Sequence, residues 1–249
     1  MEWRCLIYVV LVSLLWPVFA SGAEPVTVSP ETLKAVAASV RQLVEDDEAV
    51  GAEVLILHKR KVVLHEAFGW SDLDRRTPLT RNTIVCVRSM TKPLVGTAIQ
   101  MLIDEGKLSP TDRASKYLKS FDNDKSRAVT IEQLLTHTAG FPLTLVNKQL
   151  SGYSGQRAIV DEAGKIGPSG PPGSFKYSDT DSETLAAIVA EVCGQPVDVF
   201  IRRQILEPLG MNDTYCVLEK DAPPRSRVSS NHAGSPGLWH KYWDHEAKP

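Results

Sequence analysis

The chain has 249 residues, of which 43% are hydrophobic and 23% are charged, and its 28 basic and 30 acidic side chains leave a formal net charge of −2. This composition is that of an ordinary globular protein with one sizeable core or two small ones, and it excludes a disordered or fibrous chain. The charges are scattered along the chain rather than gathered in blocks, so nothing favours a nucleic acid as a partner.

The N-terminal residues differ from the rest of the chain. A short start with one arginine leads into an apolar stretch, residues 5–19, and small residues follow at 20–23. This layout predicts a secretory signal peptide over residues 1–23, cleaved after either alanine of the small-residue stretch, and a protein that is periplasmic or secreted. A membrane anchor is the alternative, but the apolar run is shorter than the ~20 residues of a spanning helix, and Pro17 interrupts it. We expect no membrane span after removal of the signal.

The rest of the chain, residues 24–249, is expected to form one domain. Residues 31–45 carry apolar side chains at helical spacing, which predicts an amphipathic helix that lies across a sheet. Residues 52–57 and 61–67 are β-rich runs separated by three polar residues, and this pattern predicts a hairpin of antiparallel strands. Residues 69–83 are predicted to form an irregular crossing loop.

The period becomes helical again over residues 89–105. Gly106 follows where a helix usually ends, Ser89 stands at the N-terminal edge, and Pro93 falls in the first turn, where a missing backbone donor costs little. We expect this helix to be buried along one face, because its apolar residues repeat every three to four positions: Leu94, Val95, Ala98, Ile99, Leu102 and Ile103.

Later segments are predicted to be mostly helical. Thr130 begins a capping box and predicts a short helix that ends near Gly140. Residues 164–173 are rich in Gly and Pro and must form a loop. Apolar spacing then predicts one helix that ends at Gly194 and another that begins at Pro196. The final thirty residues show no period, so no terminal strand or helix is expected to close the domain.

Neither the cysteines nor the histidines indicate a metal site. Cys86, Cys193 and Cys216 remain after the signal, none of them in a C-x-x-C pair, and at most one internal disulfide can form. Cys86 lies in an apolar run and is expected to be a small buried hydrophobe. His240 and His245 lie on different helical faces, and a disordered tail is the expectation there. We expect no metal and no organic cofactor.

One short motif carries candidate chemistry. Ser89 and Lys92 have the spacing S-x-x-K, and three residues of helix bring the hydroxyl and the amine to one face. Serine is a weak nucleophile until a neighbour takes its proton, and lysine can do so only where burial or positive charge keeps its amine partly neutral. The helix N-terminus can stabilise negative charge on a substrate oxygen. This spacing arises about once by chance in such a chain, so a capping serine and a solvated lysine are the alternative interpretation.

Tyr177 is the second candidate. It follows the Gly- and Pro-rich loop and precedes a predicted helix, so its hydroxyl could project into a cleft and act as a second general base. In the alternative interpretation the tyrosine packs on the surface while Asp179 or Asp181 caps the helix. Residues 242–244 repeat the Tyr-x-Asp pattern, so the pattern alone is not specific.

Several motifs, taken in chain order, resemble one family. The segments are Phe-Gly-Trp-Ser-Asp-Leu at 68–73, Arg-Ser-Met-Thr-Lys-Pro at 88–93, Glu-Gly-Lys-Leu-Ser at 105–109, Leu-Leu-Thr-His-Thr-Ala-Gly at 134–140, Tyr-Ser-Asp at 177–179 and Glu-Pro-Leu-Gly-Met at 207–211. In order and separation they resemble the serine β-lactamase-related family, which includes class C β-lactamases, D-alanyl-D-alanine carboxypeptidases and related esterases. The resemblance covers residues 50–216.

The resemblance implies a fold and a site. The fold is α+β, an antiparallel sheet flanked by helices with an all-helical subdomain at about residues 107–198. Ser89 is the implied acylated nucleophile and supplies one oxyanion donor from its backbone N–H, while Lys92 and Tyr177 share the proton transfers. His137 belongs to a signature segment and is expected to be a structural, hydrogen-bonded imidazole inside the helical subdomain.

The sequence departs from the family at Asp179. This residue takes the place of the asparagine in the family's Tyr-x-Asn motif and is the expected substrate-binding residue. A carboxylate only accepts hydrogen bonds and favours the charged form of a nearby amine, so Lys92 would be a weaker base and Tyr177 would carry the larger share of proton transfer.

A second departure concerns the family's third motif, of the His/Lys-Thr/Ser-Gly kind. We expect this motif, and the later strands that carry it, to lie beyond the end of the chain, which would leave the domain C-terminally incomplete. A His-Ala-Gly run begins at His232, but it comes too soon after Tyr177, and Pro236 stands close to it, which a central strand would not tolerate.

These observations lead to a predicted function. We expect a serine hydrolase that forms an acyl-enzyme with the amide or ester carbonyl of a small molecule or peptide: a β-lactam, a D-Ala-D-Ala peptide or an ester. The alternative is an exported, catalytically inactive binding protein that retains the penicillin-recognising fold, as Asp179 and the missing third motif would suggest. The sequence leaves the oligomeric state open.

Overall fold

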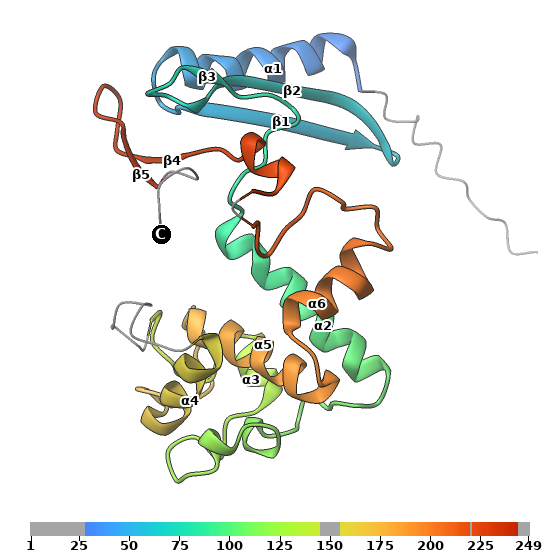
Figure 1. Cartoon of the computed structure of the whole chain (residues 1–249), viewed down its shortest axis with the longest axis vertical. Helices are drawn as coiled ribbons and strands as arrows, with labels where there is room; N and C mark the ends of the chain where they lie inside the picture. Colours follow the sequence, from blue (N-terminus) through green and yellow to red (C-terminus); the bar gives the residue numbers. More distant parts are fainter. Residues whose placement is uncertain (1–27, 145–154, 220, 244–249) are drawn as a thin grey trace, which may run out of the picture.

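The computed structural model describes residues 28–144, 155–219 and 221–243. At one end a helix, α1, lies on an antiparallel sheet; at the other is a helical body, and α2 runs between the two (Figure 1). The predicted α+β fold with a helical part is confirmed. The predicted signal peptide lies outside the described residues, and the limits 107–198 of the helical subdomain stay a prediction.

The sheet has three strands in the order β1 (Gly51–His58), β2 (Lys61–Asp72) and β3 (Thr77–Pro78). The predicted hairpin is confirmed: Lys59 and Arg60 join β1 to β2, and both have positive φ angles, as a tight two-residue hairpin turn requires. The predicted loop at 69–83 is wrong at its start, since β2 continues to Asp72 and pairs with β3.

Helix α1 (Pro30–Glu45) packs on β1 and β2, as its apolar spacing predicted. Ser29 caps it by accepting a hydrogen bond from the Thr32 backbone N–H at 3.1 Å. Ala37 is the only fully buried hydrophobic residue that this layer contributes among the described residues, so the main core lies elsewhere.

The predicted helix at 89–105 consists of two pieces. A 3-10 turn, η1 (Arg88–Thr91), holds Ser89, and α2 (Lys92–Asp104) follows with Pro93 in its first turn, as predicted. The buried stripe is also as predicted, but α2 makes its main contacts with α5 (Asp179–Cys193) and α6 (Val197–Ile201) rather than with the sheet.

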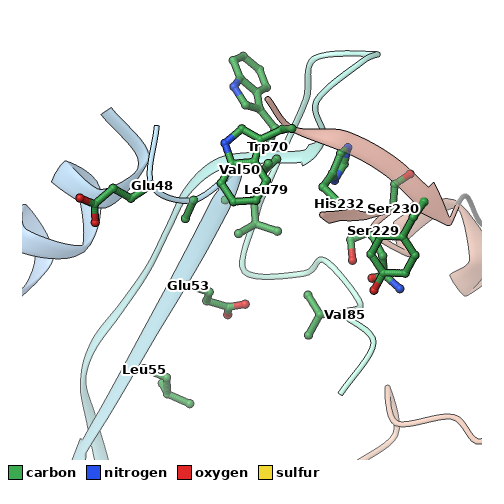
Figure 2. Close-up of a pocket in the computed structure, with 15 residues that line it drawn as sticks. Glu48, Val50, Glu53, Leu55, Trp70, Leu79, Val85, Ser229, Ser230 and His232 are labelled. Carbon is green, nitrogen blue, oxygen red and sulfur yellow. The ribbon is translucent and has the colours of Figure 1, made fainter. Parts of the chain in front are cut away.

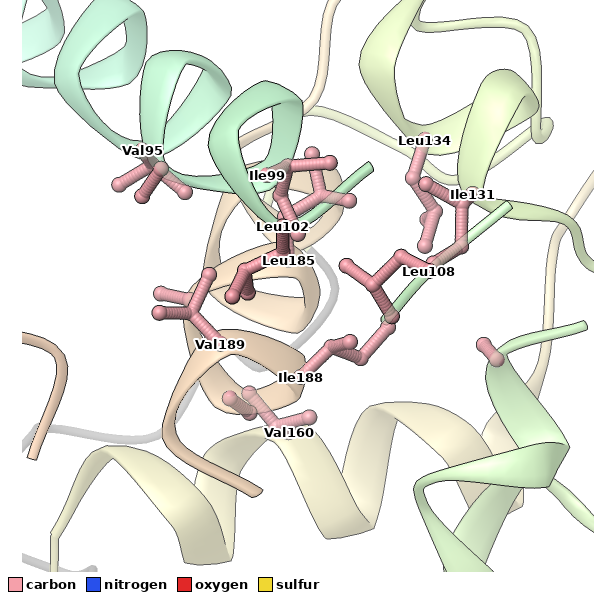
Figure 3. Close-up of a cluster of buried hydrophobic side chains, with 14 of the residues drawn as sticks. Val95, Ile99, Leu102, Leu108, Ile131, Leu134, Val160, Leu185, Ile188 and Val189 are labelled. Atoms are coloured by element: carbon pink, nitrogen blue, oxygen red, sulfur yellow. The ribbon is translucent and has the colours of Figure 1, made fainter. Parts of the chain in front are cut away.

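The core belongs to the helical body. It joins α2, α5 and α6 to α3 (Ile131–Leu135), α4 (Gln156–Ile166) and the π-helix η5 (Arg202–Leu206), and the short 3-10 turns η2 (Ala114–Lys116) and η3 (Lys119–Phe121) close its far side. Figure 3 shows buried side chains of α2, α3, α4 and α5 gathered in this core, among them Leu102 and Ile188, which are both fully buried. Burial stabilises by about 1.5–3 kcal/mol for each large side chain, so this body holds α2 and α5 in fixed relation.

The Thr130 capping box and the Gly194 end of α5 are confirmed, but α3 ends at Leu135, before the predicted end near Gly140. Helix α4 was not predicted, and the expected loop at 164–173 begins only after it. Gly164 belongs to the last turn of α4 because Phe121 packs directly on it: a Cβ at Gly164 would meet Phe121 Cδ2 at 2.5 Å. A glycine that signals a loop in the sequence is here a packing position.

The C-terminal part is more ordered than the sequence indicated. A 3-10 turn, η6 (Pro223–Arg227), precedes a two-stranded antiparallel hairpin of β4 (Asn231–Ala233) and β5 (His240–Trp243), so the prediction that no strand forms there is wrong. Long-range contacts hold the hairpin: Trp239 Nε1 donates to the Asp47 carbonyl at 3.1 Å, and Lys241 Nζ donates to Asp72 at 2.7 Å. Strands of three and four residues are too short to show a period.

Two further observations concern the cysteines and the membrane question. Cys86 is exposed, which corrects the prediction of a buried hydrophobe, and Cys86, Cys193 and Cys216 are all free. Within the described ranges no single helix is both long and apolar enough to cross a membrane. The consecutive segments Asp179–Cys193 and Val197–Leu206 meet those criteria only when combined, and they are bent by 78° at the break between them.

Candidate active site

Ser89 and Lys92 meet at the junction between η1 and α2. Arg88, the first residue of η1, has a φ of +45°, in the left-handed region that bulky residues rarely adopt. Ser89 follows directly after this unusual backbone conformation. Lys92 Nζ donates a hydrogen bond to Ser89 Oγ at 3.0 Å. The lysine side chain is only 18% exposed, which argues against the alternative of a solvated lysine.

The N-terminus of α5 supplies the third and fourth predicted residues. Asp179 Oδ1 accepts from Lys92 Nζ at 2.7 Å, and the ammonium lies 4.7 Å from the centre of the Tyr177 ring. The cap of α5 is Ser178, whose hydroxyl accepts from the Asp181 backbone N–H, so the alternative in which an aspartate caps this helix is wrong. The structure therefore brings together all four residues that the sequence singled out.

The signature segment 134–140 helps to position Tyr177. The end of this segment and the residues just after it run beside segment 173–179, and backbone hydrogen bonds join the two. They extend from Lys176 N to His137 O at 2.7 Å, from Gly173 N to Thr138 O at 2.9 Å and from Asp179 N to Leu143 O at 2.9 Å. Because these bonds flank Tyr177 on both sides, they restrict where its ring can lie.

His137 is the hydrogen-bonded imidazole that we expected. Its Nδ1 lies 2.9 Å from Asp181 Oδ2, and its ring centre is 4.8 Å from that of Tyr177. Asp181 was considered only as a helix cap from the sequence. Nothing in the local sequence marks it as the partner of a histidine 44 residues away, since tertiary packing brings the two together.

The charges at the site are coupled. Burial alone would lower the pKa of the Lys92 amine, but hydrogen bonds with Asp179 and Tyr177 outweigh it and hold the pKa above its usual value. Hydrogen bonding to Lys92, and then to Ser89, lowers the pKa of the Tyr177 phenol. The amine is therefore charged at neutral pH, and the phenol gives up its proton more readily than an ordinary tyrosine does.

Ser89, Lys92 and Asp179 line one pocket of about 410 Å³, with Val95 on its apolar side and Glu183 on its polar side. It lies between the start of α2 and the start of α5. No cluster of three potential metal ligands occurs in the described part of the chain.

A second pocket, of about 690 Å³, lies between β1, the segment before η1 and the C-terminal hairpin, with Glu53, Val85 and His232 at its wall (Figure 2). His232 Nε2 accepts from the Leu73 backbone N–H at 3.4 Å and does not line the Ser89 pocket, so the His-Ala-Gly run does not join the site. His240 lies in β5 rather than in a disordered tail, and His245 falls outside the described residues.

Asp181 provides a test of the buried network. It is fully buried, and its Oδ1 has no hydrogen-bond partner among the described residues. Burial raises the pKa of this carboxyl from 3.8 to about 6, although His137 acts in the opposite direction. Because the folded-state pKa is the higher one, the folded protein binds the extra proton between these values, and stability falls as the pH rises through this window.

We expect Asp181→Asn to remove this pH dependence. Relative to the wild type, the free energy of unfolding of the variant should rise by about 2 kcal/mol between pH 4 and pH 8, since one pKa unit corresponds to ~1.4 kcal/mol and the unfolded carboxyl is already partly ionised at pH 4. Urea denaturation of both proteins at five pH values measures the difference. A difference that stays constant with pH would contradict the assigned cause, because all other carboxylates are shared by the two proteins.

Comparison with known proteins identifies the family of the chain. The sequence of residues 36–248 matches the family model described as Beta-lactamase. The chain is 31% identical over 174 residues to the putative penicillin-binding protein PbpX of Bacillus subtilis (strain 168), across 68% of this chain and 43% of PbpX. It thus spans less than half the length of that relative.

Solved structures have a similar fold. A penicillin-binding protein homologue from Caulobacter crescentus superposes with a TM-score of 0.70 at 26% identity, over 82% of this chain and 55% of that chain. A class C beta-lactamase superposes with a TM-score of 0.72 at 20% identity, over 90% of this chain and 62% of that chain, which is evidence for the fold alone. Since the family model matches most of the chain, the chain belongs to the Beta-lactamase family.

Proposed function

We propose that this chain transfers the acyl group of an amide or ester carbonyl to Ser89 and then hydrolyses the acyl-enzyme. The observation that carries the proposal is the 3.0 Å hydrogen bond between Lys92 Nζ and Ser89 Oγ, at the wall of a pocket of about 410 Å³. A nucleophile in contact with a group that can move its proton is the arrangement that acyl transfer needs.

The steps follow from the charges. Ser89 Oγ attacks the carbonyl carbon while its proton passes to the Tyr177 phenolate, because the lowered pKa of Tyr177 makes its deprotonated form accessible, whereas the raised pKa of Lys92 keeps the amine protonated. The Lys92 ammonium stabilises the negative charge that appears beside it, and the backbone N–H of Ser89 faces the developing oxyanion. The leaving group departs with the proton held by Tyr177, and water then cleaves the Ser89 ester by the reverse sequence of transfers.

The proposed substrates are a β-lactam, a D-Ala-D-Ala peptide or a simple ester, which share an electrophilic acyl carbonyl. The likeness to a putative penicillin-binding protein supports a carbonyl of the penicillin kind. Residues 1–23 support export, and a periplasmic or secreted location forms part of the proposal.

A specific observation favours the second candidate, a binding protein that does not turn over its ligand. The 2.7 Å bond between Lys92 and Asp179 keeps the amine protonated, and a protonated amine cannot accept the serine proton. The two candidates differ in whether a covalent acyl-enzyme forms and is hydrolysed.

Covalent labelling tests the proposal. The purified chain is incubated with a fluorescent penicillin and, separately, with p-nitrophenyl butyrate, and labelled protein is digested for peptide mapping by mass spectrometry. We expect one added acyl group, on the peptide that contains Ser89, together with release of nitrophenol. Reversible binding without any covalent adduct would favour the binding protein, and an adduct on another residue would contradict the assigned nucleophile.

Replacing Asp179 by asparagine tests the role of the carboxylate. The charge of Asp179 opposes ionisation of Tyr177, so its loss lowers the Tyr177 pKa further, and we expect kcat/KM for the ester at pH 7 to rise by about three- to tenfold and its acidic limb to move to lower pH. The matched control is Glu191→Gln, which removes an ion-paired carboxylate from the same helix outside the pocket. A loss of activity in Asp179→Asn would show that the carboxylate assists the reaction.

A further inference from the structure

Glu183 is a charged group in the active-site pocket that the proposed reaction does not use. It lies on α5 four residues after Asp179, so the two carboxylates occupy the same face of the helix, one turn apart. Both line the pocket that contains Ser89 and Lys92. Glu183 is half-buried, whereas acidic residues without a structural partner are usually exposed.

The charges around Glu183 leave it without a partner. Lys92, whose charge acts on Glu183, is bonded to Asp179, and no hydrogen bond or ion pair of the Glu183 side chain occurs within the described ranges. Burial, and then the charge of Asp179, raise the pKa of the Glu183 carboxyl, while Lys92 opposes them. Arg88 also lines the pocket, but it is exposed, and ion pairs with exposed side chains contribute little.

We propose that Glu183 pairs with a positively charged group on the acyl substrate, and so makes the site selective for cationic over neutral substrates. A substrate cation would supply the counter-charge that the protein does not, in a partly desolvated pocket where such a pair is stronger than at the surface. This inference rests on the proposed acyl transfer at Ser89, because it assigns the charge of the substrate of that reaction.

Pairs of substrates that differ only in charge test whether Glu183 selects cationic substrates. On the acyl side, p-nitrophenyl 4-(trimethylammonio)butanoate is compared with its carbon isostere, p-nitrophenyl 5,5-dimethylhexanoate. On the alcohol side, choline butanoate is compared with 3,3-dimethylbutyl butanoate. The readout at pH 8 is the ratio of kcat/KM for the charged and neutral members of each pair, which cancels general changes in activity. We expect Glu183→Gln to lower this ratio about tenfold for at least one pair.

Glu191→Gln serves as the control, because it removes the same charge from α5 outside the pocket and should leave both ratios as in the wild type. If Glu183→Gln leaves both ratios unchanged while the wild type hydrolyses the esters, the role of Glu183 is overturned and the acyl-transfer function stands.

A binding measurement separates this failure from failure of the proposed function. If the wild type hydrolyses no ester and forms no covalent adduct with the fluorescent penicillin, the function is contradicted, and Glu183 is judged from equilibrium binding of 4-(trimethylammonio)butanamide and 5,5-dimethylhexanamide by NMR titration. Tighter binding of the cationic amide that disappears in Glu183→Gln supports the pairing. Equal affinities of the wild type for the two amides overturn it.

Discussion

Replacing Ser89 by alanine is expected to abolish covalent labelling by a fluorescent penicillin and to lower kcat/KM for p-nitrophenyl butyrate by about 10⁴-fold or more. Without the hydroxyl no acyl-enzyme can form, and what remains is water attack assisted only by binding. Ser89 is exposed, and its hydroxyl bonds with the site residues Lys92 and Tyr177 rather than with the core, so the substitution should leave the free energy of unfolding almost unchanged.

The matched control is Ser182→Ala. Ser182 lines the same pocket, but none of the proposed steps involves its hydroxyl. We expect it to keep labelling and turnover, measured by gel fluorescence and by nitrophenol release. Labelling that survives in Ser89→Ala and disappears in Ser182→Ala would transfer the nucleophile to α5.

The second large effect is expected for Lys92→Met, which keeps the length of the side chain and removes its charge. Loss of the ammonium that stabilises the Tyr177 phenolate and the negative charge beside Ser89 should lower kcat/KM by about 10³-fold. The variant also leaves Asp179 without its 2.7 Å partner, so its free energy of unfolding is measured in parallel by urea denaturation.

Lys92→Arg separates charge from proton transfer. Arginine keeps the positive charge but stays protonated, so it can stabilise Asp179 and a Tyr177 phenolate without exchanging a proton. If Tyr177 carries the larger share of proton transfer, Lys92→Arg retains more activity than Lys92→Met, and Tyr177→Phe is as impaired as Lys92→Met. Equal loss in Lys92→Arg and Lys92→Met, with an active Tyr177→Phe, would assign the base to Lys92 instead.

Local sequence determined the parts of the fold whose signals lie within one or two turns. The apolar period of α1, α2 and α5, the capping box at Thr130 and the hairpin turn after His58 all act over a few residues, and each is found in the structure. The same is true of the contact between Ser89 and Lys92, because three residues of helical chain place them on one face whatever the rest of the protein does.

Only the tertiary structure decided the other half of the site. The resemblance named Tyr177 and Asp179 but could not place them; 87 residues separate Lys92 from Asp179, and their 2.7 Å contact exists because α2 and α5 pack on a common core. The predictions of a buried Cys86 and of no C-terminal strand were wrong for a related reason, because both features depend on residues distant in sequence. The C-terminal hairpin, for example, is held by the hydrogen bond from Lys241 to Asp72. Periodicity reports which face of an element is apolar, whereas the distance between two polar groups depends on how the elements pack, which no local pattern records.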